Sequence, residues 1–425
     1  MTRSNQVMRV CVAAALAGWS AGVWASGFQL LEQNASGLGN AYSGQAAAAE
    51  NASTIYFNPA GMTRLPGTQI SGALNMIKPS TKFENTGSAA PALRPLGDNG
   101  GDAGGWAYVP NAYLSWQLTP RLWAGIGLSV PFGLKTEYNA TWIGRFQAIK
   151  TEMKTYDINP SVAWKVNDSF SVGAGVSYQH VDVKLNRAVN FVLSEGALAL
   201  DVDDAQWGFN LGALINPGPK TRIGLTYRSS MGYTLKGTAA VTGAVTATPS
   251  VAANIRLPDT YSAALSHALS DRWELLADYT YTRWSSVKAI PLVTTSASAL
   301  GAVGTTLDTI NFQFKDTYRV GLGTNFKWTG DFTLKLGIAY DKSPVDDAFR
   351  TVSLPDNDRT WLAIGGKYRV GKAGAFDFGY AHLFISDGSI NSRQGVAAVP
   401  NQKGNVVGNY KNSVDIVSFQ YTHSF

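Results

Sequence analysis

Histidine is the side chain that most often serves as a general base or a metal ligand, so the four histidines are the first candidates for chemistry. They are His180, His267, His382 and His423. Each shares its alternation with apolar neighbours, as Tyr178 does with His180, which predicts that all four point outward from a sheet. Scattered outward histidines form neither a Ser–His–Asp triad nor a zinc site. The sequence predicts no catalytic residue, no metal and no cofactor, and a lipid-acting enzyme is the least favoured alternative.

The only cysteine, Cys11, lies in a segment that has the pattern of an export signal. Two arginines near the start supply positive charge, residues 10–17 form a short apolar run, and residues 23–25 are a suitable cleavage site. We therefore expect a signal peptide over residues 1–25 and a mature chain that begins at Ser26. Such a chain has no cysteine and cannot form a disulfide.

The composition excludes several classes of protein. Charged residues are 15% and aromatic residues 11% of the 425 residues, and the mean hydropathy is -0.06. A helical membrane protein would be far more apolar, and no apolar run of about 18 residues follows residue 25. A disordered chain would carry more charge and fewer aromatic residues. The net charge of +6 is not gathered into a Lys/Arg cluster, so nucleic acid is not a predicted partner.

Long stretches of the chain alternate between apolar and polar residues, as the run from Phe332 to Asp341 does. A period of two is typical of a strand with one apolar face. Many of these stretches reach ten or more residues, which is the length that a tilted membrane strand requires. We expect an all-β protein in which these apolar faces contact lipid.

The connections predict the number of strands. Six short polar turns fall at 119–120, 167–168, 217–220, 270–272, 329–331 and 371–374. Seven longer stretches fall at 84–105, 133–152, 188–204, 238–256, 289–308, 343–358 and 387–409. Thirteen connections join fourteen antiparallel strands, and an even count with short turns on one side is typical of bacterial outer-membrane barrels. The alternation that ends on Phe425 resembles an assembly signal, so the barrel-assembly machinery is a predicted partner.

Residues 26–67 do not have the pattern of a barrel strand. A barrel of about fourteen strands encloses more space than its own side chains fill. The apolar residues of this segment, Phe28, Leu30, Ile55 and Phe57 among them, favour burial inside the barrel. We therefore expect an N-terminal hatch over 26–67 and a transmembrane barrel over 68–425. A periplasmic tail without a gate is the alternative.

Eight short blocks carry the most recognisable pattern. They are GFQL at 27–30, SGLG at 36–39, AYSG at 41–44, NPA at 58–60, GLKTEY at 133–138, FKDTYR at 314–319, SPV at 343–345 and LPDNDR at 354–359. In this order the sequence resembles the FadL family of outer-membrane long-chain fatty-acid transporters. The resemblance implies a 14-stranded barrel with a hatch, and passive uptake of long-chain fatty acids or, in part of the family, of hydrocarbons.

The resemblance also implies roles for single residues. Hatch or gate roles fall on Phe28, Gln29, Asn58, Pro59 and Ala60. A kink that opens the wall beside the hatch falls on Pro131, Phe132 and Gly133, with Asn58 close by. A ligand head-group pair falls on Lys315 and Arg187.

Alternation supports one of these assignments. In the tenth strand, residues that share one face are expected to meet lipid, and Lys315 and Arg319 fall on the opposite, inward face. The expected lipid-facing residues are Phe312, Phe314, Tyr318, Val320 and Leu322. A carboxylate in the lumen requires a cation, which is the chemistry that Lys315 would supply.

The exit route follows from the hydrophobic effect. Burial of an acyl chain gains about 0.8 kcal/mol per methylene, and release into water would reverse that gain. Release sideways into outer-membrane lipid would not, so a gap in the third strand is expected. Proline removes a ladder donor and glycine permits a bulge, so the stretch at Pro131 could also simply end the strand. A general porin is a further alternative.

Overall fold

The computed structural model describes residues 27–425; the expected signal peptide at 1–25 lies outside them. Residues 68–425 form a closed antiparallel barrel of 14 strands, which confirms the prediction. The last strand pairs with the first along its whole length, from Gln69 opposite Ser424 to Asn85 opposite Gly408. Within the described residues, no helix is long and apolar enough to cross a membrane.

Six of the wall strands are interrupted, so that 20 strand segments make the 14-stranded wall. The uninterrupted strands are β1 (Thr68–Asn85), β2 (Ala107–Thr119), β5 (Lys150–Lys165), β6 (Phe170–Asn190), β7 (Glu195–Gly218), β16 (Phe332–Asp341), β17 (Arg359–Val370) and β20 (Asn405–Ser424). The interrupted strands are β3 and β4 (Leu122–Ser129, Gly133–Glu137), β8 and β9 (Thr221–Arg228, Met231–Thr242), β10 and β11 (Ser250–Leu257, Thr260–Ala268), β12 and β13 (Trp273–Thr282, Ala289–Thr294), β14 and β15 (Thr306–Asn311, Thr317–Lys327), and β18 and β19 (Gly374–Ile385, Gly388–Arg393).

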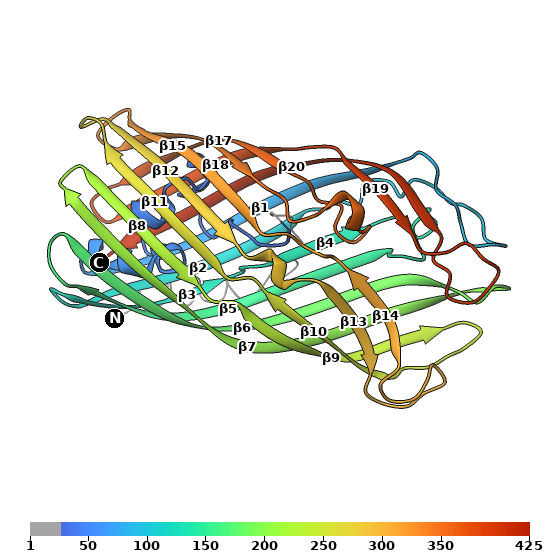
Figure 1. Cartoon of the computed structure of the whole chain (residues 1–425). Coiled ribbons are helices and arrows are strands. Elements are labelled where there is room, and N and C mark those ends of the chain that lie inside the picture. Colours follow the sequence, from blue (N-terminus) through green and yellow to red (C-terminus); the bar gives the residue numbers. More distant parts are fainter. Residues whose placement is uncertain (1–26) are drawn as a thin grey trace, which may run out of the picture.

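Short turns gather at one end of the barrel and longer connections at the other (Figure 1). The turns occur where the sequence predicts them, but several strands run further outward than predicted. β4 occupies 133–137 inside an expected loop, and β6 and β7 form one long hairpin with a turn at 191–194. Most of the polar and small residues at 188–204 therefore lie in strands. A strand that extends outside the bilayer does not need an apolar outer face.

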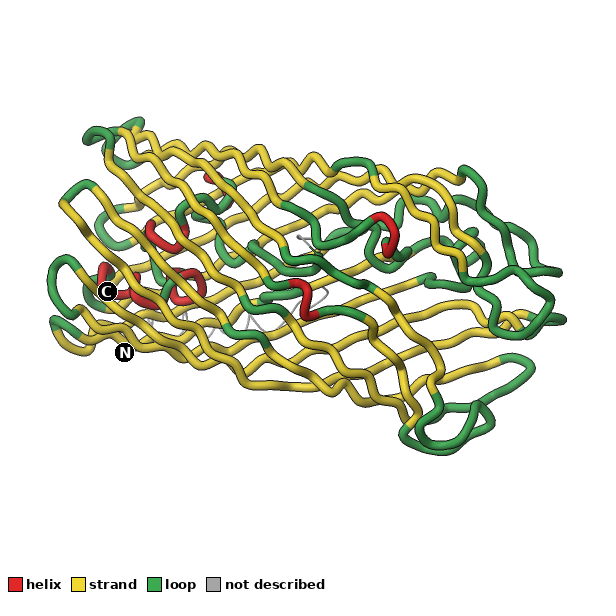
Figure 2. Tube along the Cα trace, viewed as in Figure 1, coloured by secondary structure: helices red, strands yellow, loops and turns green. Residues whose placement is uncertain are grey.

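The N-terminal segment, residues 27–67, lies inside the short-turn half of the barrel (Figure 2). Its helices are η1 (Leu38–Asn40), α2 (Gln45–Ala48), α3 (Thr54–Phe57) and η2 (Pro59–Arg64). They contact strands around the circumference, from β3 and β5 to β8, β11 and β15–β18. Two further short helices, η3 (Trp284–Ser286) and η4 (Asp347–Phe349), belong to the connections of the wall.

Inward glycines make room for this segment. A Cβ at Gly125 would lie 2.6 Å from Ile55 Cδ1, and one at Gly321 would lie 2.6 Å from Ser43 Oγ. The inward Gly-x-Gly pairs of the sequence thus serve packing, because the N-terminal segment approaches the wall too closely for a further side chain.

The outer face is apolar, as the alternation predicts. In β15, Tyr318, Val320 and Leu322 are 42%, 41% and 53% exposed, which is the lipid side of the wall. The interior changes along the axis. Polar and charged side chains surround the N-terminal segment, whereas an apolar cluster that includes Leu134, Met153, Leu235 and Leu292 fills the lumen above it.

Candidate functional site

The start of the N-terminal segment pairs with the interruption in the third wall strand. Leu30 N–H donates to Pro131 O and Gly133 N–H donates to Phe28 O, both at 2.8 Å. Gln29 stands opposite Phe132 as an antiparallel bridge between these two bonds. Among the described strands, β4 pairs only with β5, and its other edge bonds to the N-terminal segment at Gly133 and to Ala103 at Glu137. A short strand of the N-terminal segment thus completes the wall from inside.

Four aromatic side chains meet at this place and form the aromatic cluster, namely Phe28, Phe132, Trp284 and Phe314. The ring of Phe28 lies 4.7 Å from that of Trp284 and 6.2 Å from that of Phe132, and Trp284 lies 5.7 Å from Phe314. All four are at most 5% exposed. Three of them come from interruptions in three different wall strands, so the broken ladders direct aromatic side chains into the lumen.

Phe312 and Phe314 therefore do not face lipid, and that prediction is wrong. Both are buried, at 7% and 0% exposure, inside the apolar cluster of the lumen. The alternation of inward and outward side chains does not continue from β14 into β15, because β14 ends at Asn311 and β15 begins at Thr317. Gln313 between them has φ 45°, a left-handed backbone that rotates the following side chains out of strand parity.

The same break corrects the position of Lys315. Its side chain is 71% exposed and pairs with Asp346 of the outer connection after β16. It does not line the cavity that opens into the lumen, whereas Arg319, at 5% exposure, does. The inward assignment was right for Arg319, which lies within β15, and wrong for Lys315, which lies in the break.

Arg187 points into the barrel and is 4% exposed. Its Nε lies 3.3 Å from Asp308 Oδ2, and Lys403 pairs with the other oxygen of the same carboxylate. One buried and one partly buried cation thus share one carboxylate. Leu185 and Val189, on the same face of β6 as Arg187, belong to a buried apolar cluster beside them. Burial lowers the pKa of Lys403, and the nearby Arg187 lowers it further, against the opposite effect of Asp308.

Asn58 does not lie at the kink in the third strand, which corrects a second prediction. Its side-chain amide donates to Ala46 O at 2.7 Å and to Ala213 O of β7 at 3.0 Å, and its Oδ1 accepts from Ala60 N–H. Asn58 is therefore the N-cap of η2 and fixes that turn against β7. Pro59 follows at the first helical position, where a missing N–H costs nothing.

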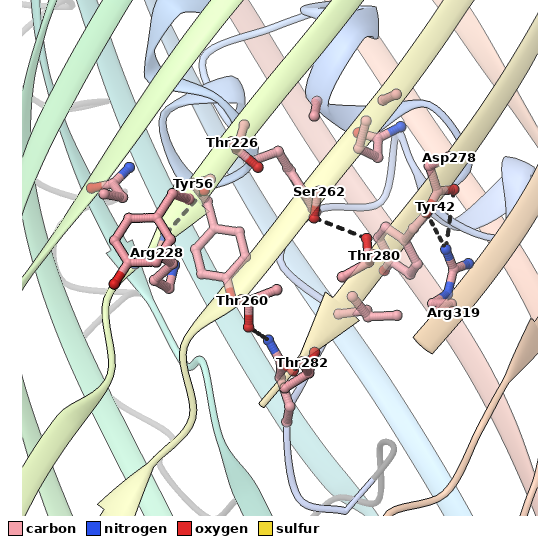
Figure 3. Close-up of a pocket in the computed structure, with 18 of the residues that line it drawn as sticks. Tyr42, Tyr56, Thr226, Arg228, Thr260, Ser262, Asp278, Thr280, Thr282 and Arg319 are labelled. Carbon is pink, nitrogen blue, oxygen red and sulfur yellow. Dashed lines mark hydrogen bonds and ion pairs between the residues drawn. The ribbon is translucent and has the colours of Figure 1, made fainter. Parts of the chain in front are cut away.

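A cavity lies between the N-terminal segment and the wall formed by β8, β11, β12 and β15 (Figure 3). Its empty volume, with the part that is open, is about 970 Å³. Hydroxyl side chains cover the wall, including Thr226, Thr260, Ser262, Thr280 and Thr282. Gln29 closes one side, with its amide group 3.4 Å from both the Thr260 and the Thr282 hydroxyl oxygens. The cavity combines these hydroxyl groups with a larger apolar surface, to which Trp284 of the aromatic cluster contributes.

Residues 15–425 match the family model described as outer membrane protein transport protein (OMPP1/FadL/TodX). The chain belongs to this family. It is 31% identical to a putative outer membrane protein of Neisseria meningitidis, over 96% of both chains. It is 28% identical to the long-chain fatty acid transport protein of Escherichia coli, over 92% of this chain and 95% of the relative. The crystal structure of a Pseudomonas aeruginosa FadL homologue has the same fold, with a TM-score of 0.86, 23% identity, and coverage of 94% of this chain and all of that one.

The chain is thus an outer-membrane barrel of a family that transports fatty acids or other hydrophobic compounds. Members of the family are transporters rather than enzymes. The four histidines lie on four separate strands, and the Nδ1 atom of His382 lies 2.8 Å from a carboxylate oxygen of Asp415. The resemblance to the FadL family is confirmed.

Three inward cations of the wall bond to backbone carbonyls of the N-terminal segment. The sequence did not predict these contacts. Arg222 Nε donates to Ala47 O at 3.1 Å, Arg319 donates to Ala41 O, and Lys335 Nζ donates to Ser36 O at 2.8 Å. Each cation also has a carboxylate partner, at 2.8–2.9 Å. The partners are Glu274 for Arg222, Asp278 for Arg319 and Glu50 for Lys335. The sequence could indicate that each of these cations lies on the inward face of its strand. It could not show which backbone carbonyl each cation reaches.

Glu32 is a further residue that the sequence reasoning missed. It is fully buried in the N-terminal segment, and neither carboxyl oxygen has a hydrogen-bond partner among the described residues. Burial raises its pKa to about 7, an effect that Arg359 opposes and Asp341 strengthens. Glu32 is therefore largely uncharged at mildly acidic pH. The sequence gives one indication of this residue, because Glu32 is the only acidic residue near the apolar start of the segment.

Proposed function

We propose that this protein takes up long-chain fatty acids passively, binds them in the lumen and releases them sideways into the outer membrane. The name of the E. coli relative supports the substrate class. The apolar lumen above the N-terminal segment supports the binding of an acyl chain, because burial of each methylene gains about 0.8 kcal/mol. The sequence carries no nucleotide-binding motif, so transport is proposed to follow the gradient.

The observation that carries this proposal is the group of two cations around one carboxylate. Arg187 and Lys403 together hold Asp308, which leaves one positive charge without a partner inside an apolar region. A buried charge without a partner is costly, so an incoming carboxylate would be stabilised there. The proposed head-group site therefore keeps Arg187 and places Lys403 where the resemblance implied Lys315.

Sideways release is proposed at the interrupted third strand, at Pro131, Phe132 and Gly133. The only backbone pairing on the inner edge of this stretch, among the described residues, is with residues 28–30. If those residues withdraw, the wall between β2 and β4 loses the strand that completes it. Phe28 would leave the aromatic cluster in the same movement, so the acyl chain would gain a path from the lumen to lipid.

Binding to the purified barrel in a nonionic detergent tests the substrate. We expect dodecanoate to bind at least about tenfold more tightly than its methyl ester, as a charge-assisted hydrogen bond would provide. The variant Arg187→Gln should reduce that preference, and Lys315→Gln, which removes an exposed cation, is the matched control. Equal affinity for acid and ester in the native protein would contradict fatty-acid uptake.

Uptake of aromatic hydrocarbons by the same route is the second candidate. The aromatic cluster favours it, since Phe28, Phe132, Trp284 and Phe314 would offer edges and faces to a planar ligand. Tighter binding of an alkylbenzene than of dodecanoate would favour this candidate. The cluster, the N-terminal segment and the lateral exit would keep their roles in that case.

A further inference from the structure

The cavity beside the aromatic cluster contains a cation that differs from the other inward cations. Arg222, Arg319 and Lys335 each hold a carbonyl of the N-terminal segment and a carboxylate of the protein. Arg228 also holds such a carbonyl, since its Nη2 donates to Tyr56 O at 2.9 Å, and its guanidinium lies 4.4 Å from the Tyr56 ring. Within residues 27–425, however, Arg228 forms no ion pair.

The carboxylates near the cavity form no direct bond to Arg228 among the described residues, although the charge of Arg228 acts on the buried Asp157. Asp278 takes two hydrogen bonds from Arg319, and both lie at the opposite side of the cavity from Arg228 (Figure 3). Asp341 lies beside Arg319 and Arg359 in the register of the sheet. Asp157 reaches Arg228 only through Ser177, whose hydroxyl is 3.3 Å from the carboxylate and 3.4 Å from the guanidinium.

The surroundings of Arg228 suit an oxyanion. The hydroxyl groups of Thr226, Thr260 and Ser262 line the same cavity and can donate to a carboxylate. Ser262 and Thr280 already bond to each other at 2.9 Å, so the wall is preorganised. The other side of the cavity is bounded by Leu31, Phe57 and Trp284, which gives a chain attached to the carboxylate an apolar surface.

We propose that this cavity is a second station for the carboxylate of an amphipathic acid, with Arg228 as the residue that pairs with it. The station lies on the far side of Gln29 from the paired strand at residues 131–133. Gln29 meets the Thr260 and Thr282 hydroxyls only at 3.4 Å, so its withdrawal would cost little. A fatty acid whose head leaves the outer cations could then be held here while its chain crosses the aromatic cluster. This inference rests on the proposed function.

The test removes the outer station first. In Arg187→Gln, we expect dodecanoate to retain a smaller preference over its methyl ester, of about fivefold, and we expect Arg187→Gln/Arg228→Gln to lose it. The measured quantity is the ratio of the dissociation constants of acid and ester. If loss of the bond to Tyr56 loosened the N-terminal segment, both ligands would bind more weakly and the ratio would not change. Arg256→Gln, which removes an exposed arginine of β10 outside the cavity, is the matched control.

Thr260→Val in the Arg187→Gln background gives an independent measurement, since it removes one hydroxyl without changing the charge. We expect a loss of about threefold in the preference for the acid. If Arg187→Gln alone abolishes the preference, there is no second station and the inference is overturned while fatty-acid uptake stands. If the native protein shows no preference for the acid, fatty-acid uptake fails and the second station fails with it.

Discussion

At the scale of single residues, Glu32 links the pH of the medium to the docking of the N-terminal segment. Its pKa in the folded protein, about 7, lies above the ordinary value of 4.5. The folded state therefore binds more protons than the unfolded state between these two values, and stability falls as the pH rises. The contribution is complete below about pH 4.5 and is lost as the pH rises through 7. Above that, a charged carboxylate is buried near Asp341, which repels it.

We predict that docking of residues 27–33 weakens from pH 5.5 to pH 8, by up to about 2 kcal/mol, and that Glu32→Gln removes this dependence. Glutamine keeps the shape of the side chain but does not titrate. Hydrogen exchange of this peptide, corrected for the intrinsic effect of pH, measures the change. An unchanged pH dependence in Glu32→Gln would assign it to another group.

Lys335 provides a second prediction at this scale. Its side chain is 2% exposed and lies between Glu50 of the N-terminal segment and Asp377 of the wall, at 2.8 and 3.6 Å. Lys335→Met would leave both carboxylates buried without that cation, which costs about 3–5 kcal/mol. Lys367→Met is the matched control, because Lys367 is more exposed and lies 3.7 Å from the same carboxylate of Glu50.

We therefore expect Lys335→Met to speed proteolysis within residues 36–50 strongly, and Lys367→Met to change it little. Limited proteolysis of the purified barrel, followed by mass spectrometry, locates the cuts. Similar protection of the segment in both variants would show that the interactions of Lys335 do not hold it in place.

At the scale of elements, the interruptions in the wall strands leave backbone groups that the neighbouring strands do not pair. An unpaired backbone within the bilayer is costly, so a broken strand needs another partner. At the third strand that partner is residues 28–30, and at the tenth strand it is the chain near Lys288, which accepts from Phe312 N–H. Only the first of these partners belongs to the N-terminal segment, which is not part of the barrel wall.

A disulfide between these elements tests the lateral exit. Gln29 and Phe132 form an antiparallel pair without hydrogen bonds between them, flanked by the bonds of their neighbours, which is the closer kind of cross-strand pair. We predict that Gln29→Cys/Phe132→Cys, once oxidised, binds dodecanoate but takes up none, and that reduction restores uptake. The predicted mature chain has no other cysteine to interfere.

Uptake measured in cells that express the variant, before and after a reductant, gives the comparison. The reduced double variant is the control for the loss of the Phe132 ring. Undiminished uptake by the oxidised protein would place the exit elsewhere in the wall.

At the scale of the whole molecule, the N-terminal segment occupies the short-turn half of the lumen and bonds to strands on every side. We predict that deleting residues 27–60 leaves a folded barrel but raises its conductance in planar bilayers at least about tenfold, because 14 strands enclose a water-filled channel when nothing plugs them. Single-channel recording measures this. Equal conductance of the two proteins would favour a general porin and would refute the plug.

The outer wall was the most predictable part of the molecule. Lipid imposes one apolar residue in two on every strand, so Tyr318, Val320 and Leu322 could be assigned by counting, and so could the 14 strands. The count failed where the ladder stops, at Phe312, Phe314 and Lys315, since parity has meaning only within an unbroken strand. After His180, apolar residues of β6 no longer mark the lipid side of the wall. Val181 and Leu185 are buried inside the barrel, because the lumen is apolar there.

The sequence by itself determined the class of the protein, since export, the alternation and the family blocks depend only on neighbours along the chain. The tertiary structure decided the site. It brought Phe132 to Trp284, Arg228 to Tyr56 and Asn58 to Ala213, pairs more than 100 residues apart. It also decided which cations have carboxylate partners. Such pairings follow from the closure of the barrel around the N-terminal segment, and no local pattern records which residues face each other across a lumen.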